Sequence, residues 1–209
     1  MIFINMVNNL LKLLKEEGIN DDNVLNSIKN IPRENFVLEE YKKNAYSDIA
    51  LPIVSGQTIS QPYTAAFMLQ KLELKKGDKV LEIGAGSGWN SALINYITKN
   101  IVYTVEFNEN VAVFAANNLK KFKDVKLIIG DGNKGYEKER PYDKIIVTAA
   151  CSKMPFDLVK QLKNNGILLV PVGNLSEQNL LKITKIDDEI IKENLGKFVF
   201  VPLKGKYGF

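Results

Sequence analysis

The chain has 209 residues, enough for one well-packed domain, and a modest formal net charge of +4. One cysteine and no histidine exclude an internal disulfide, the usual Cys/His zinc sites and a histidine-based triad, so no metal is expected. No apolar run approaches the ~18 residues of a membrane span and no secretory signal is evident, which favours a cytoplasmic protein without membrane partners. Scattered lysines favour a solvated surface over nucleic acid, and only Arg33 and Arg140 have the forked group that suits phosphate.

The N-terminal part predicts two amphipathic helices. Residues 6–17 carry apolar side chains at helical spacing, and Gly18 stands where a C-cap glycine belongs. A second short helix is expected to start near Asp22 and to stop before Pro32. We expect these helices to form an annex that covers one side of a sheet.

Residues 31–70 show no sustained periodicity and are broken by prolines and glycine. Long irregular stretches in compact domains are usually functional, which makes this segment a candidate active-site loop. Its part from Ser55 to Tyr63 is dense in hydroxyl and amide side chains. The same residues also suit a helix start, with Ser60 or Thr64 as the cap of the apolar run at 65–72.

The stretch 79–106 predicts a strand, a glycine turn, a helix and a second strand that ends in an acid. Glycines let the backbone approach a ligand, and Glu106 at the strand tip can accept both hydroxyls of a ribose. A nucleoside pocket is therefore expected here. The alternative is a generic strand-to-helix turn without a ligand.

The spacing of the glycines distinguishes between nucleosides. The dinucleotide fingerprint is G-x-G-x-x-G, whereas Gly84, Gly86 and Gly88 form G-x-G-x-G and Trp89 takes the place of the third glycine of that fingerprint. A bulky indole there disfavours a nicotinamide oxidoreductase. The pattern instead resembles the nucleotide loop of class I methyltransferases, which bind S-adenosylmethionine.

The remaining segments alternate between strands and helices. We expect helices at 108–122 and 156–162, and strands at 125–129, 145–148, 167–172, 180–186 and 197–203. The predicted fold class is α/β, with a doubly wound, mostly parallel sheet of the Rossmann-like methyltransferase type and an antiparallel edge strand. One domain spans 1–209, with helices and an active-site loop at 6–76 and the cofactor-binding core at 77–209.

Further motifs accompany the glycine loop: the segments Ile31–Glu34, Leu51–Ile53, Gly56–Tyr63, Gly130–Gly132, Pro141–Asp143, Thr148–Ala150, Pro171–Gly173 and Phe200–Leu203. Together they resemble the protein-L-isoaspartate O-methyltransferase family along residues 7–204. The glycine loop alone indicates only a methyltransferase. The segment from Gln57 to Pro62 is the specific element.

The resemblance implies methyl transfer from S-adenosylmethionine to the α-carboxylate of L-isoaspartyl residues in damaged proteins, leaving S-adenosylhomocysteine. The ester then closes to a succinimide, whose hydrolysis restores some normal aspartate. A carboxylate with a pKa near ~4 is already ionised at neutral pH, so no general base is needed. In this family pattern Ser60 is the catalytic residue, orienting the carboxylate by hydrogen bonding, and Thr58 assists.

The resemblance also assigns binding residues. The cofactor set is Thr58, Ser60, Glu82, Gly84, Gly86, Gly88, Glu106, Phe107, Asp131 and Gly132, with Glu106 on the ribose and Asp131 on the adenine amino group. The substrate set is Ile59, Ala149 and Ala150. Asp131 also suits a simple cap or turn before Gly132.

Three positions depart from the family pattern: Ala85 in the glycine loop, Cys151, and the turn 163–166 with its Asn165. None removes a group that methyl transfer needs, although the turn can shift the strand that follows. Cys151 is expected to be an ordinary small residue near the pocket wall. The open alternatives are a methyltransferase with another acceptor and a nucleoside-binding protein without catalysis, and the oligomeric state is not indicated.

Overall fold

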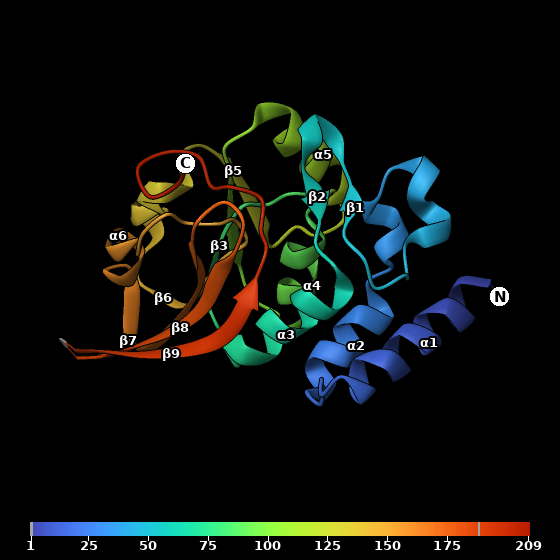
Figure 1. Ribbon diagram of the computed structural model, residues 1–209, viewed down its shortest axis with the longest axis horizontal. Helices are drawn as coiled ribbons and strands as arrows, with labels where there is room; N and C mark the ends of the chain where they lie inside the picture. Colours follow the sequence, from blue (N-terminus) through green and yellow to red (C-terminus); the bar gives the residue numbers. More distant parts are fainter. Residues whose placement is uncertain (1, 188) are drawn as a thin grey trace.

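The computed structural model describes residues 2–187 and 189–209 and is built on one central sheet (Figure 1). Its strands, in the spatial order β5-β4-β3-β6-β7-β8-β9, are β3 (Val80–Ile83), β4 (Val102–Glu106), β5 (Val125–Ile129), β6 (Tyr142–Val147), β7 (Leu162–Gly173), β8 (Gln178–Ile186) and β9 (Glu189–Phe198). Pairing is parallel from β5 to β7 and antiparallel for β8 and β9. The predicted mostly parallel sheet with an antiparallel edge is confirmed.

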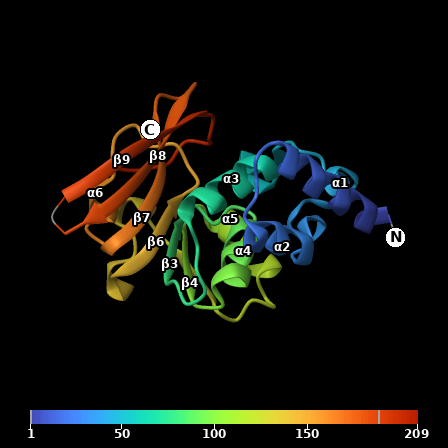
Figure 2. The ribbon, with the colours of Figure 1, turned by 90° about the horizontal axis from the view of Figure 1, so that it is seen from below.

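The sheet separates two apolar cores, because alternate residues of each strand point to opposite faces. Val80 and Leu169 belong to the core shared with α3 (Pro62–Leu72), α4 (Trp89–Thr98) and α5 (Glu109–Asn118). Leu81 and Leu168 belong to the other core, which α6 (Phe156–Val159) and the last residues of the chain complete. Figure 2 shows α3, α4 and α5 on one side of the strands.

The predicted N-terminal helices are confirmed as α1 (Ile2–Glu16) and α2 (Asp22–Asn30). Asp21 caps α2 by accepting the N–H groups of Asn23 and Val24. Gly18, at φ +90°, ends α1 in the left-handed conformation that glycine tolerates. The two helices do not cover the sheet directly: α2 packs on α4, so they form an outer layer, drawn in blue in Figures 1 and 2.

The loop-rich segment after α2 is ordered by short elements: η1 (Arg33–Phe36), η2 (Glu39–Asn44), β1 (Leu51–Pro52), η3 (Val54–Gly56) and β2 (Thr58–Ile59). Strands β1 and β2 form a small antiparallel hairpin. Neither Ser60 nor Thr64 caps α3; Asp48 does so from the preceding loop, accepting the Tyr63 N–H at 2.7 Å. The N–H groups of the first helical turn have no acceptor within the helix, so the Tyr63 N–H needs one from outside. The capping alternative for Ser60 is therefore wrong.

Three predicted boundaries are also wrong. The strand expected at 197–203 ends at Phe198, because β8 and β9 form a hairpin whose pairing closes at Gln178 and Phe198. Helices α5 and α6 end earlier than expected, at Asn118 and Val159. The turn expected at 163–166 lies within β7, where the pairing register with β6 shifts. Regular pairing with β6 resumes at Ile167.

Candidate active site

A cavity of about 470 Å³ lies at the carboxyl ends of the parallel strands, where ligands of open α/β sheets bind. Loops after β3, β4 and β6 line one side, and residues 57–61 line another. Residues 199–204 form a further wall. Nine of the predicted site residues are in the lining: Thr58, Ile59, Ser60, Gly84, Gly86, Glu106, Phe107, Gly132 and Ala149.

The glycine loop depends on positive φ angles and on close packing under it. Gly84, at φ +95°, donates its N–H to the Val105 carbonyl at 2.8 Å. Its own carbonyl accepts the Thr148 hydroxyl at 2.7 Å. A Cβ at Gly84 would lie 2.5 Å from that hydroxyl oxygen, so this position has no room for a side chain. The loop therefore stays low against β6 and leaves space above it for a ligand.

Gly84→Ala is expected to destabilise the fold more than Gly77→Ala. Gly77 has nearly the same backbone angle, φ +94°, but no atom lies within 4 Å of a Cβ added there, so it reports the backbone strain alone. The strain costs ~1–3 kcal/mol at either position. The contact with Thr148 should add ~1–3 kcal/mol at Gly84. Urea unfolding of both variants measures the difference, and equal losses would contradict the crowding of this loop.

The carboxylate of Glu106 is held by two backbone N–H groups. Its Oε2 accepts from Gly86 at 3.1 Å, and its Oε1 accepts from Asn108 at 3.0 Å. A carboxylate oxygen accepts about two hydrogen bonds, so each oxygen keeps one free lone pair at the cavity. Two adjacent hydroxyl groups match this arrangement, as the sequence predicts for a ribose.

Four predicted residues lie outside the lining of the described cavity: Glu82, Gly88, Asp131 and Ala150. Glu82 is fully buried behind the loop, where its carboxylate accepts from Asn90 at 2.7 Å, from Thr104 at 2.7 Å and from the Ser91 hydroxyl. Glu82 thus ties α4 and β4 to β3 rather than facing the ligand space. Burial raises the pKa of Glu82 to about 7, although the three hydrogen bonds act in the opposite direction and lower it.

Glu82→Gln is expected to change how stability depends on pH. A carboxyl whose folded pKa rises from 4.5 to about 7 stabilises the fold below pH 4.5 and loses that contribution as pH rises through 7. At ~1.4 kcal/mol per pKa unit the loss is on the order of 3 kcal/mol. Glutamine cannot ionise, so the variant does not lose this contribution. Its free energy of unfolding in urea should therefore rise relative to that of the wild type between about pH 5 and about pH 8. A difference in free energy of unfolding between the two proteins that stays the same across this pH range would contradict the raised pKa of Glu82.

Gly88, Asp131 and Ala150 support the site from outside the described lining of the cavity. Gly88, at φ +84°, leads into α4 and packs against Leu119, whose Cγ would lie 2.8 Å from an added Cβ. Asp131 caps η4 (Gly132–Lys134) by accepting the Asn133 N–H at 2.9 Å, which is the structural role considered for it, and its contact with adenine stays a prediction. Ala150 pairs with residues 201–203.

The Ser60 loop faces the glycine loop across the cavity. Ile59 is buried and pairs with Leu51 in the β1–β2 hairpin, which fixes the chain on either side. The Ser60 hydroxyl has no hydrogen-bond partner among the described residues, and neither does that of Thr58. These hydroxyls are therefore free to donate to a ligand in the cavity.

The wall at 199–204 was not expected from the sequence. After β9 the chain crosses the carboxyl ends of the strands, where Leu203 donates its N–H to the Ala150 carbonyl at 2.9 Å. Its Lys204 and the opposite Glu106 are the charged residues of the described lining. The sequence shows a motif at Phe200–Leu203, but its placement depends on where β9 ends, which periodicity does not resolve.

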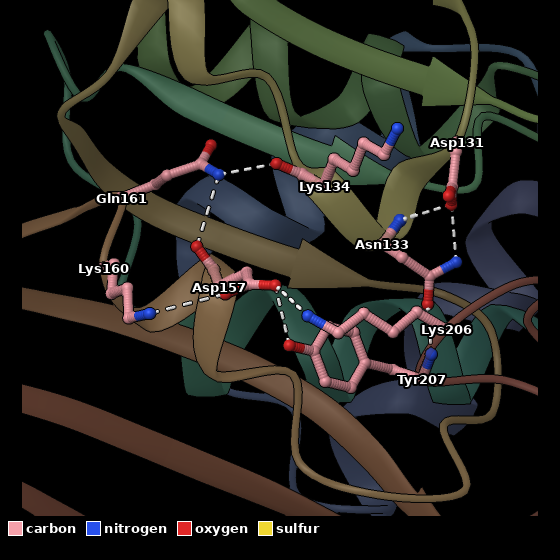
Figure 3. Close-up of polar contacts among 8 residues, drawn as sticks. All are labelled: Asp131, Asn133, Lys134, Asp157, Lys160, Gln161, Lys206 and Tyr207. Carbon is pink, nitrogen blue, oxygen red and sulfur yellow. Dashed lines mark hydrogen bonds and ion pairs between the residues drawn. The ribbon is translucent and has the colours of Figure 1, made fainter.

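Polar side chains anchor the residues that follow this wall (Figure 3). The buried Asn133 donates to Asp131 at 2.6 Å and to the Lys204 carbonyl, and accepts the Tyr207 N–H at 2.7 Å. Asp157 accepts from the Tyr207 hydroxyl at 2.7 Å and from Lys206 at 2.9 Å. The hydrogen bonds from Lys206 and Tyr207 lower the pKa of Asp157 to about 2. The last residues are thereby tied to the loop that carries Asp131 and Gly132.

Three further residues that the sequence analysis singles out lie in different surroundings. Cys151 is buried beside the pocket wall, and burial raises its pKa to about 12, so it is a packed small residue as expected. Arg33, noted for its forked group, is also fully buried and turns inward to backbone carbonyls. It is not placed for phosphate recognition. Phe107 is 57% exposed at the rim of the cavity, where a flat ligand can cover it.

No helix in the described parts of the chain has the length and apolar character needed to cross a membrane.

Comparisons with known proteins agree with this geometry. The sequence matches the family described as protein-L-isoaspartate(D-aspartate) O-methyltransferase over residues 5–208. Proteins named protein-L-isoaspartate O-methyltransferase are 46% identical in Dictyoglomus thermophilum, covering 96% of this chain and 91% of that one, and 46% identical in Pyrococcus horikoshii, covering 95% and 93%.

Solved structures give the same result. A protein-L-isoaspartate O-methyltransferase superposes with a TM-score of 0.88 at 30% identity, covering 97% of this chain and 67% of that one. A structure described as a beta-aspartate methyltransferase from Plasmodium falciparum, in complex with S-adenosyl-L-homocysteine, has a TM-score of 0.84 at 30% identity, covering 94% and 97%. The chain therefore belongs to the protein-L-isoaspartate(D-aspartate) O-methyltransferase family.

Proposed function

We propose that this chain transfers the methyl group of S-adenosylmethionine to the α-carboxylate of L-isoaspartyl residues in damaged proteins and peptides. The observation that carries this proposal is that Glu106, the glycine loop and Ser60 line one and the same cavity. One side offers acceptors for a nucleoside, and the other offers free hydroxyl donors for an anionic group. The family membership supports the same pairing of donor and acceptor.

The residues present fit the cofactor. The cavity volume of about 470 Å³ lies in the ~300–1,000 Å³ range of small-molecule sites. Glu106 would hold the ribose through its two free lone pairs, Phe107 would lie along the adenine, and Gly132 would close the base pocket. When bound, S-adenosylmethionine supplies an electrophilic methyl carbon on a cationic sulfur, and S-adenosylhomocysteine is its product.

The chain's own residues orient the acceptor and exclude water. A carboxylate is ionised at neutral pH, so no side chain has to remove a proton. Removing such a group from water is costly unless hydrogen bonds replace the lost solvent. The Ser60 hydroxyl donates one of these bonds and Thr58 assists, while Ile59 and Ala149 present apolar surface. Orientation of reacting groups accounts for several kcal/mol of barrier lowering in enzymes.

The two parts of the chain divide this work. Residues 6–76 carry the acceptor loop, and residues 77–209 carry the cofactor loop and the wall at 199–204. The product ester closes to a succinimide without further help, which makes the biological role protein repair. A cytoplasmic location belongs to the same proposal, since a lone buried cysteine suits a reducing compartment.

Methyl-labelled S-adenosylmethionine and a matched pair of peptides test this function. The peptides share one sequence and differ only in an isoaspartyl or aspartyl linkage. Label should enter the isoaspartyl peptide alone. Transfer to both peptides would refute the specificity, and tight binding of S-adenosylhomocysteine without any transfer would indicate a nucleoside-binding protein.

A further inference from the structure

Arg33 is a fully buried cation that joins the turns of the acceptor loop. Its Nη1 donates to the Ala45 carbonyl at 2.6 Å, and its Nη2 donates to the carbonyls of Ile49 at 3.2 Å and Ser60 at 2.8 Å. The three acceptors lie on both sides of the β1–β2 hairpin. One rigid guanidinium therefore sets the spacing between the start of the loop and the backbone of Ser60.

The other face of the same group contacts the cofactor side. The Arg33 guanidinium carbon lies 5.2 Å from the centre of the Trp89 ring. Trp89 is the first residue of α4, directly after the glycine loop, and its N–H contacts the Ser87 hydroxyl at 3.2 Å. Trp89 and Ser60 both line the cavity. Arg33 thus contacts both Trp89, which follows the glycine loop, and the backbone of Ser60 in the acceptor loop.

Backbone carbonyls, not a carboxylate, hold the charge of Arg33. No carboxylate forms an ion pair with Arg33 within the described residues, and its Nε has no hydrogen-bond partner there. Burial lowers its pKa to about 10, although Asp48 and Tyr46 nearby act in the opposite direction. An apolar side chain at this position would leave the carbonyls of Ala45, Ile49 and Ser60 without their donor. A planar fork with several fixed donors therefore has no apolar substitute.

We propose that Arg33 is a positioning residue, which holds the Ser60 backbone at a fixed distance from the glycine loop so that acceptor and methyl donor meet in line. The assignment rests on the proposed methyl transfer. Lysine keeps the charge at this position but has a single ammonium, which cannot reach three carbonyls and stack on Trp89 together.

Arg33→Lys tests the proposal, with Arg140→Lys as its matched control. Arg140 is the other arginine of the chain, and its side chain is exposed beside Glu137. The Arg33 variant should lose ~10–100-fold in kcat with the isoaspartyl peptide, as expected for a small misplacement of reacting groups. Its Kd for S-adenosylhomocysteine should change much less than kcat, because Arg33 contacts Trp89 but neither Glu106 nor Gly86. The control should match the wild type.

A double-mutant cycle with Ser60→Ala separates positioning from general destabilisation. If Arg33 acts through Ser60, Arg33→Lys should lower kcat by no more than about twofold in the Ser60→Ala background. If the two substitutions instead lower kcat independently, so that their fold-losses multiply in the double variant, the assignment is overturned. A loss of S-adenosylhomocysteine binding as large as the loss of kcat would also overturn it.

Arg33→Gln serves as the second variant if the lysine variant does not fold. Failure of both to fold would give Arg33 a folding role instead and would also overturn the assignment. A wild-type chain that does not methylate the peptide at all would refute the proposed function, which is a distinguishable result.

Discussion

Ser60→Ala is expected to lower kcat with an isoaspartyl peptide by ~10–100-fold. Ser60 lines the cavity, and its hydroxyl has no hydrogen-bond partner among the described residues, so it is available to the acceptor carboxylate. A hydrogen bond to a charged group contributes ~1.5–3 kcal/mol, and ~1.4 kcal/mol corresponds to a factor of ten in rate. The Kd for S-adenosylhomocysteine should change little. Steady-state kinetics and calorimetry measure the two quantities.

Ser47→Ala is the matched control for this prediction. Ser47 belongs to the same loop-rich segment, but it lies outside the described lining of the cavity. Its removal should leave kcat at the wild-type value. Loss of S-adenosylhomocysteine binding in the Ser60 variant would show that Ser60 belongs to the nucleoside pocket, and an unchanged kcat would refute its role in orienting the acceptor.

Glu106→Ala should produce the opposite pattern. Its carboxylate is fixed by Gly86 and Asn108 and keeps a free lone pair on each oxygen. Loss of the ribose contacts should weaken S-adenosylhomocysteine binding by ~1.5–3 kcal/mol, which raises the Kd by ~10–100-fold. At saturating cofactor, kcat should fall much less.

Glu109→Ala controls for the loss of a negative charge near the site. Glu109 is the first residue of α5, three positions further along, and it is exposed. The Glu109→Ala variant should bind S-adenosylhomocysteine with the Kd of the wild type. Unaltered affinity in the Glu106 variant would refute the ribose assignment, and a loss in both variants would indicate a general effect of charge.

Local patterns predicted those parts of the fold that depend on local chemistry. The apolar run, the glycines and the acid at 79–106 specify a strand, a turn and a second strand because each feature acts within a few residues. The predictions of β3, α4 and β4 are therefore confirmed, and Glu106 lies at the end of β4. The family resemblance added the Ser60 loop, which the residues alone left open between an active-site role and a helix cap.

Contacts between distant segments could not be predicted in this way. Asp48 caps α3 from outside the helix, Arg33 reaches three carbonyls, and the wall at 199–204 depends on where β9 ends. Glu82 was expected at the cofactor, yet three side chains from α4 and β4 hold it behind the loop. Such partners are set by topology, not by spacing along the chain.

The central claim is that this cavity aligns an oxygen that is already ionised, with no residue acting as a base. The most direct measurement is kcat for the isoaspartyl peptide between about pH 6 and about pH 9, where the acceptor carboxylate is fully ionised. The assay should follow formation of S-adenosylhomocysteine rather than the labile ester. The Glu82→Gln variant is measured in parallel, because burial raises the pKa of Glu82 to about 7. We expect kcat to vary by no more than about twofold across this range. A rise of about tenfold per pH unit through a pKa in this range, present in both proteins, would reveal a catalytic base and contradict the claim.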